Sequence, residues 1–161
     1  MQHCFPPVTR ADTRLLVLGS LPGAVSLERS QYYAHPRNHF WRLMGAVIGR
    51  ELVPLEYEAR LDALLEAGVG LWDTVAAATR KGSLDADIRL HAASDLAALV
   101  ATLPKLGAIA FNGGTSAKIG RRQLPATTLD LIDLPSSSPA YTIRFEEKLR
   151  SWLRLRAYLR Q

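Results

Sequence analysis

The sequence is poor in cysteine and has no long apolar run. Cys4 is its only cysteine, so no disulfide can form within the chain and an iron–sulfur cluster held by cysteines is excluded. The histidines have no paired cysteines and no His-x-x-x-His spacing, so no zinc site is indicated. No apolar run approaches the ~18 residues of a membrane span, and the first residues lack the apolar centre of a signal peptide. We therefore expect a soluble, cytoplasmic protein without a metal site or a membrane partner.

Lysine is also scarce, and arginine supplies most of the positive charge. The formal net charge is +5. Guanidinium groups match phosphate oxygens in two-point geometry, so a basic, arginine-rich domain suits nucleic-acid binding. A GC-rich genome would give the same composition, and the charge alone does not decide between the two explanations. The arginines near the carboxyl terminus are interpreted as solvated surface.

The length and the apolar fraction favour one globular domain over residues 1–161. Short apolar runs that end in turn residues predict strands, and they alternate with helical patterns. Such alternation predicts an α/β domain around a mostly parallel sheet. The expected strands lie in "TRLLVLGS", "VGLWDTV", "LGAIAFNGG" and "TTLDLIDL".

The expected helices are marked by caps and by apolar spacing. One should begin at Pro36 and end near Gly49, and another should begin after Ser94 as its N-cap. The segment "TRKGSLDADIR" reads as a loop. Further helices are expected in "EYEARLDALLEAGVG", in "TSAKIGRRQL" and at the carboxyl terminus, where Phe145, Leu149, Trp152, Leu153 and Leu159 share one face.

Three unusual loops follow the expected strands. Gly19–Gly23 contains a Pro-Gly turn, "FNGG" follows the third strand, and "LPSSSPA" follows the last. In α/β sheets, ligands bind beyond the carboxyl ends of the strands. We therefore expect these loops to meet around one pocket.

Several polar and aromatic groups in these loops suit nucleic-acid chemistry. Of Tyr32 and Tyr33, an exposed ring can stack on a base, while at least one ring is expected to pack under the loop. Asn38 can position a water or cap the helix, and Asn112 can read a base edge or serve the turn. The hydroxyls of Ser136, Ser137 and Ser138 suit phosphate contacts or an ordinary turn.

With these motifs in place, the chain resembles the uracil-DNA glycosylase superfamily, and within it the hypoxanthine-DNA glycosylase group (DNA-deoxyinosine glycosylases, family six). The resemblance is carried by "GSLPG…S…YYAHPRNHFW" and "LPSSSPAY", with "GLWDTV…GSLDADI" and "FNGGTSAK" between them. It extends from about Leu15 to Leu159. It implies a three-layer α/β/α fold with a central four-stranded parallel sheet, base excision from DNA, and no metal or organic cofactor.

The resemblance also assigns roles. It implies that Asn38 carries the catalytic amide, that Tyr33 stacks on the flipped base and that Asn112 recognises it. Two positions depart from related enzymes. Leu21 stands where mismatch-specific relatives have asparagine, and Leu134 stands where uracil-specific enzymes have histidine. The usual machinery for uracil is therefore absent.

The expected mechanism is hydrolysis of the bond between the sugar and a deaminated base, with hypoxanthine as the expected base. Backbone N–H groups of Ser20 and Leu21 would hydrogen-bond the departing base, and Ser136–Ser138 would hold phosphates. Asp73 is a less favoured addition to the pocket. The alternatives are a uracil or G·U mismatch glycosylase, a non-catalytic nucleic-acid-binding domain on the same fold, and an unrelated hydrolase of free nucleosides. A monomer is expected, because nothing in the sequence indicates oligomerisation.

Overall fold

The computed structural model describes residues 2–80 and 88–159 of the chain. Its centre is a parallel sheet in which the strands lie in the order β3-β2-β6-β7. β2 and β6 occupy the middle, and every residue of both strands is buried. Continuous apolar runs are typical of parallel strands that are covered on both faces. The four-stranded parallel sheet expected from the sequence is confirmed, with strands β2 (Leu15–Gly19), β3 (Val69–Asp73), β6 (Ala108–Asn112) and β7 (Asp130–Leu134).

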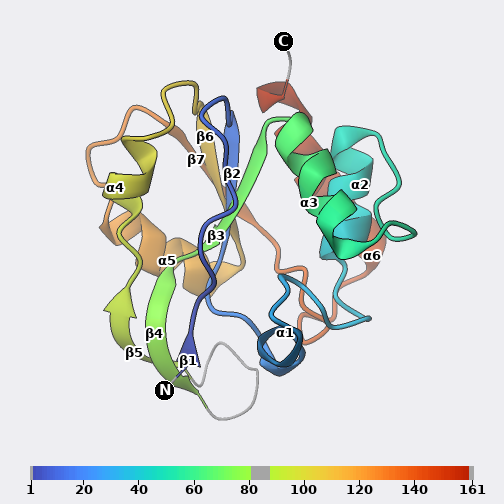
Figure 1. Cartoon of the computed structure of the whole chain (residues 1–161), viewed down its shortest axis with the longest axis horizontal. Coiled ribbons are helices and arrows are strands. Elements are labelled where there is room, and N and C mark those ends of the chain that lie inside the picture. Colours follow the sequence, from blue (N-terminus) through green and yellow to red (C-terminus); the bar gives the residue numbers. More distant parts are fainter. Residues whose placement is uncertain (1, 81–87, 160–161) are drawn as a thin grey trace.

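Helices cover both faces of this sheet (Figure 1). One face packs against α2 (Phe40–Ile48), α3 (Tyr57–Glu66) and α6 (Phe145–Trp152), where Phe40 and Trp152 are among the largest buried side chains. The other face packs against α4 (Leu96–Val100) and α5 (Gly114–Arg122), around Phe111. The three-layer arrangement is therefore confirmed. A short helix, α1 (Ala24–Arg29), lies near the carboxyl ends of the strands (Figure 1).

A second sheet was not expected from the sequence. β1 (Gln2–His3), β4 (Val75–Arg80) and β5 (Ile88–Ala93) form an antiparallel sheet in the order β1-β4-β5. The prediction of a loop through "TRKGSLDADIR" is therefore wrong at both ends, where strands reach Arg80 and resume at Ile88. Its middle, residues 81–87, lies outside the described residues. The alanine-rich run after Asp73 gives a weak strand signal, because small side chains have low β-propensity.

Two helices begin later than predicted. α2 starts at Phe40 rather than at Pro36, because the preceding residues form a turn in which the Asn38 N–H donates to the carbonyl of His35 (2.9 Å). α4 is capped by Asp95, whose carboxylate accepts from the N–H of Ala98 (3.1 Å). Ser94 is buried instead, so it is not the N-cap.

The carboxyl-terminal helix is shorter than expected. α6 ends at Trp152 and continues as a 3₁₀ helix, Leu153–Tyr158. The tighter winding turns Leu155 into the core, while Leu153 is only partly buried. The predicted apolar face is correct for Phe145, Leu149, Trp152 and Leu159, which all pack against the core.

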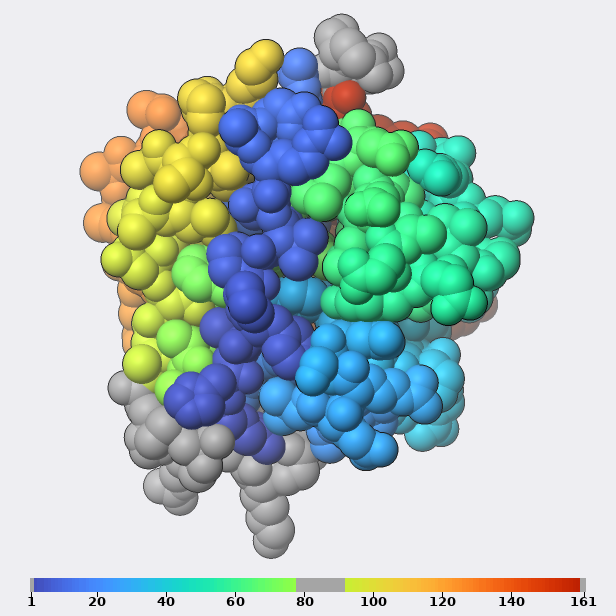
Figure 2. All heavy atoms as spheres, in the orientation of Figure 1, coloured from blue at the N-terminus to red at the C-terminus, as the bar shows by residue number. Residues whose placement is uncertain are grey.

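The amino-terminal segment runs along the surface of the molecule (Figure 2) and pairs with the edge strand β3. Val8 exchanges two backbone hydrogen bonds with Leu71, each of 2.9 Å. This pairing covers an edge that would otherwise be open to other strands. Among the described residues, no helix has the length and apolar content needed to cross a membrane.

Candidate functional site

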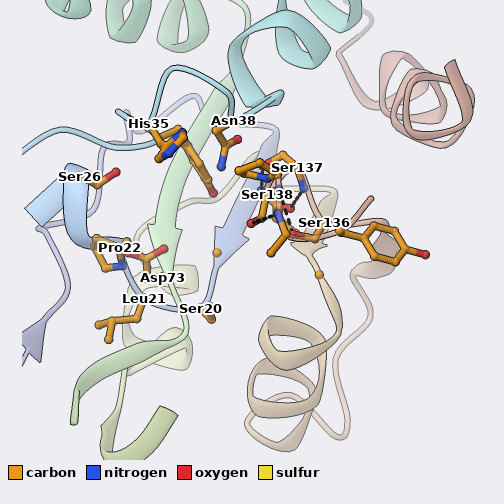
Figure 3. Close-up of a pocket in the computed structure, with 18 of the residues that line it drawn as sticks. Ser20, Leu21, Pro22, Ser26, His35, Asn38, Asp73, Ser136, Ser137 and Ser138 are labelled. Atoms are coloured by element: carbon orange, nitrogen blue, oxygen red, sulfur yellow. Dashed lines mark hydrogen bonds between the residues drawn. The ribbon is translucent and has the colours of Figure 1, made fainter. Parts of the chain in front are cut away.

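A pocket of about 350 Å³ opens at the carboxyl ends of the parallel strands (Figure 3). Its size is within the usual range for a site that holds a small ligand or a single base. The loops after β2, β6 and β7 contribute to its walls, together with Asp73 at the end of β3. Every site residue expected from the sequence lines it: Ser20, Leu21, Tyr33, Asn38, Asn112, Ser136, Ser137 and Ser138. The expected meeting of the three loops is therefore confirmed, although the roles of these residues stay predictions.

Asn38 lies immediately before α2 and projects into the pocket (Figure 3). Its Oδ1 accepts a hydrogen bond from the backbone N–H of Phe40 (2.9 Å). The side chain thus satisfies one of the N–H groups at the helix start, as the capping alternative required. That bond also fixes the amide, and the Nδ2 group is left to face the pocket. Capping and a role in the pocket are compatible for this residue.

Tyr33 has a strained backbone and a fixed ring. Its φ of 53° is in the left-handed region, which is uncommon for a non-glycine residue. Its ring stacks on Phe40, with centroids 3.8 Å apart and planes 11° apart, and its carbonyl accepts from the Trp41 indole (3.1 Å). Strain of this kind often accompanies functional sites. Tyr32, in contrast, is buried and donates its hydroxyl to the Pro6 carbonyl (2.9 Å), so it is the ring that packs under the loop.

Asn112 is clamped to Ser137. The amide Nδ2 donates to the Ser137 hydroxyl and Oδ1 accepts from the Ser137 N–H, both at 2.9 Å. Both residues are buried. Asn112 therefore joins the end of β6 to the loop after β7. An amide has a second N–H and a second oxygen lone pair, so the clamp leaves capacity for a ligand.

The hydroxyls of the serine loop, Ser136–Ser138, all act as acceptors within the protein. Ser136 accepts from the N–H of Ser138 and Ser138 accepts from the N–H of Ala140, each at 3.1 Å. Ser137 accepts from Asn112. No hydrogen bond donated by these hydroxyls occurs among residues 2–80 and 88–159. The O–H groups of Ser136 and Ser138, which are only partly buried, therefore remain as donors for an external acceptor such as a phosphate oxygen, whereas Ser137 is buried.

The first loop contributes mainly its backbone. The Ser20 carbonyl accepts from the N–H of Val75 (2.9 Å), which ties the loop to β4. The side chain of Leu21 packs with Val75 in a small apolar cluster. Leu134, at the other position that departs from related enzymes, is buried in the main core. Neither leucine offers a polar group to the pocket.

Asp73 contributes to the pocket wall, although a position in a loop or cap was the favoured expectation for this residue. It ends β3, is 3% exposed and lines the pocket. A Cβ on Gly19 would lie 2.6 Å from its Oδ1 and 3.0 Å from the Tyr33 hydroxyl, so only glycine leaves room for both groups. Burial, and secondarily the Asp73 carboxylate, raises the pKa of Tyr32. The place of Asp73 at the end of a buried parallel strand, where ligands bind in α/β sheets, is the feature of the sequence that indicates a site residue.

No metal centre is indicated by the described part of the chain. Within it, no three histidine, cysteine, aspartate or glutamate side chains gather as a ligand set. The pocket walls therefore offer amides, hydroxyls, a phenol, an imidazole from His35 and one carboxylate. This set suits binding and hydrolysis of a neutral, polar, flat ligand that has an anionic neighbour.

Comparisons with known proteins agree with this geometry. The family model described as "Uracil DNA glycosylase superfamily" matches residues 6–160. The hypoxanthine DNA glycosylase of Methanosarcina barkeri (strain Fusaro / DSM 804) is 44% identical over 112 residues, which cover 70% of this chain and 71% of that protein. The protein of the same name from Methanosarcina acetivorans is 43% identical over 109 residues, covering 68% and 69%.

A solved structure is similar over almost the full length. It is the solution NMR structure of a uracil DNA glycosylase candidate from Methanosarcina acetivorans. The TM-score is 0.88 at 35% sequence identity, and the match covers 98% of each chain.

Proposed function

The chain belongs to the uracil DNA glycosylase superfamily, and from this premise we propose that it is a DNA glycosylase that releases hypoxanthine in base excision repair. Two relatives that are 44% and 43% identical carry the name hypoxanthine DNA glycosylase. The observation that carries the proposal is the gathering of Asn38, Tyr33, Asn112 and the serine loop around one pocket. The substrate is DNA that contains a deaminated base.

The reaction is hydrolysis of the N-glycosidic bond. Water adds to the C1′ carbon of the sugar while the base leaves with the bonding electrons, and the proton lost by the water is taken up by the base or the solvent. Extruding a base costs a few kcal/mol, and less when the base pairs poorly. Hypoxanthine opposite thymine is such a pair. The protein must then stabilise positive charge on the sugar and negative charge on the base.

Each pocket group has a proposed role. The Tyr33 ring, supported from behind by Phe40, stacks on the extruded base. Asn112 reads the edge of the base, and the backbone of Ser20 and Leu21 faces its developing charge. Asn38, held by its bond to Phe40, positions the attacking water. Apart from water, the proposed reaction calls on the chain's own groups alone.

Asn38→Ala tests the catalytic role. We expect base release from duplex DNA carrying deoxyinosine to fall by about 10²-fold or more, since a water displaced by about 1 Å costs that much. Asn38→Ser is the matched control for capping, because serine also accepts from a helix N–H but its side chain is shorter. It should retain the parent's melting temperature and still lose activity. Near-parental activity of either variant would remove Asn38 from the mechanism.

A substrate panel separates the alternatives. Duplexes with hypoxanthine, uracil and xanthine should give the fastest release for hypoxanthine. Faster release of uracil would favour a uracil or G·U mismatch glycosylase. DNA binding without any free base would indicate a non-catalytic domain. Cleavage of free inosine, with no steep dependence on salt, would indicate a nucleoside hydrolase.

We further propose that the protein acts as a monomer in the cytoplasm. The pocket is formed within one chain, since its walls come from the loops after β2, β6 and β7 and from Asp73 at the end of β3. Sedimentation at micromolar concentration, with and without DNA, checks the oligomeric state.

A further inference from the structure

Lys148 is a buried cation behind the serine loop. It lies in α6, and its residue is 0% exposed. Its Nζ donates to the carbonyl of Ser138 (3.1 Å), and the Tyr141 ring centroid lies 5.8 Å away. No carboxylate pairs with Lys148 in the part of the chain that the structure describes.

A buried ammonium without an anion is costly. Removing a charge from water without pairing it costs several kcal/mol, and one carbonyl and a distant ring compensate only partly. Burial accordingly lowers the pKa of Lys148. A lysine kept in such a place, when an apolar residue would fit the core, suggests that its anionic partner comes from outside the chain.

The surroundings of Lys148 are basic as well. The backbone N–H of His39 donates to the Ser137 carbonyl (2.9 Å). The His39 ring contacts the ring of Phe145. The Arg42 guanidinium lies 3.9 Å from the centroid of the same Phe145 ring. Burial first, and then the charges of Lys148 and Arg42, lowers the pKa of His39. The buried Nδ1 of His39 has no partner among the described residues.

The serine loop faces this basic group with its carbonyls and the pocket with its hydroxyls. The Ser138 carbonyl accepts from the Lys148 ammonium, and the Ser137 carbonyl accepts from the backbone N–H of His39. The hydroxyls of Ser136 and Ser138, which are only partly buried, accept from within the protein and keep their protons for an outside acceptor. Positive charge therefore lies directly behind a row of O–H donors, which is the arrangement that binds a phosphate.

We propose that Lys148 is a positioning residue of a phosphate site, in which the serine loop contacts a DNA backbone phosphate and the buried ammonium supplies the balancing charge. This rests on the proposed function, because the phosphate is that of the bound DNA. Lys148 acts through the Ser138 carbonyl and through its charge. In the free protein it costs stability, and bound DNA offsets that cost.

The test compares Lys148→Met with Lys105→Met. Both variants lose one positive charge, but Lys105 is exposed and precedes β6, at the opposite end of the sheet from the pocket. The affinity for a duplex with an uncleavable abasic analogue is measured across a range of salt concentrations. We expect Lys148→Met to weaken binding by about 10-fold and to reduce the slope of log K against log salt by ~0.9, the value for one phosphate. Lys105→Met should match the parent.

Stability provides the second readout. Lys148→Met should melt at the parent's temperature or higher, because it removes an unpaired buried charge. A lower melting temperature together with an unchanged salt slope would show a purely structural role and overturn the inference. Should the methionine variant fail to fold, Lys148→Gln keeps a donor for Ser138 without the charge, and the same change in slope is expected.

These outcomes are distinct from failure of the proposed function. If the parent protein bound the duplex but released no base, only the proposed glycosylase activity would be refuted. The salt slopes of the two lysine variants would still decide the phosphate site.

Discussion

At the scale of single residues, the ring of Tyr33 is prepared for a ligand on one side only. Phe40 covers one of its faces at 3.8 Å, and the residue contributes to the pocket wall. A ring that is already fixed loses little entropy when a base stacks on it. The left-handed backbone at Tyr33 is the local cost of this placement.

Tyr33→Ala tests this stacking. We expect binding of a duplex with an extruded base to weaken by the ~1–3 kcal/mol that one base–ring stack contributes. Tyr33→Phe keeps the ring and removes the hydroxyl, so it should bind like the parent. Fluorescence anisotropy with labelled duplexes measures both. Equal affinities for the alanine and phenylalanine variants would contradict stacking.

The sequence was sufficient to find most of these pocket residues, but not their local bonds. Asn38, Tyr33 and Asn112 stand out because amides and aromatics are unusual in loops after buried strands. The capping bond of Asn38 depends on where α2 begins, which a Pro-based rule placed four residues too early. Lys148 gave no signal, because a lysine in an amphipathic helix reads as surface until its burial is known.

At the scale of elements, the pocket is formed by strand ends that side chains tie together. Asn112 at the end of β6 holds Ser137 after β7 by two hydrogen bonds. A Cβ on Gly113, whose φ is 96°, would lie 3.3 Å from the Ser136 Cβ, so glycine lets the two loops approach closely. Such a clamp would serve the loop geometry even if Asn112 touched no base.

Asn112→Asp separates the clamp from base reading. The carboxylate can accept from both the N–H and the hydroxyl of Ser137, so the clamp persists, and these two hydrogen bonds offset part of the cost of burying a charge. The donor for the base is lost, and we expect base release to fall by about 10²-fold, the usual cost of removing one donor from a charged transition state.

Asn112→Ala is the comparison, because it removes both functions. It should lower the stability by about 1–3 kcal/mol, since buried groups of Ser137 lose their partner. Parental base release by the aspartate variant would show that Asn112 only positions the serine loop. Thermal melts and single-turnover assays provide the two measurements.

Element boundaries were the least predictable part of the fold. The parallel strands were identified because fully buried apolar runs carry a strong pattern. The β4–β5 pair was missed because the sequence pattern of Val75–Arg80 is dominated by alanine, which has low β-propensity. Asp95 and Ser94 are both good caps, and only burial of Ser94 decides between them.

At the scale of the whole molecule, the positive charge is unevenly compensated. The carboxylates of α6 are exposed, and Glu147 lies 4.0 Å from Arg144, while His39 and Lys148 lie behind the serine loop without acidic partners in the described ranges. The net charge of +5 attracts DNA over the whole surface. The excess of positive charge behind the serine loop favours a phosphate at that loop. The net charge therefore attracts DNA to the protein, and this local charge positions the DNA strand at the pocket.

The excess of positive charge around His39 also predicts how the stability of the folded protein depends on pH. The pKa of His39 is lowered in the folded protein, first by burial and then by Lys148 and Arg42, from an ordinary value of 6.5. Below that value the unfolded chain binds a proton that the folded chain resists, so stability is lost as the pH falls through and below the ordinary pKa. His39→Gln cannot take up that proton. Urea unfolding between about pH 8 and pH 5 should therefore show a smaller loss of stability for this variant than for the parent.

The carboxylates common to both proteins cancel in the difference between the two stability curves. Parallel curves would mean that His39 titrates alike in the folded and the unfolded state. Bound DNA should shrink the difference, because a phosphate near the serine loop would favour the protonated ring and offset the repulsion from Lys148 and Arg42.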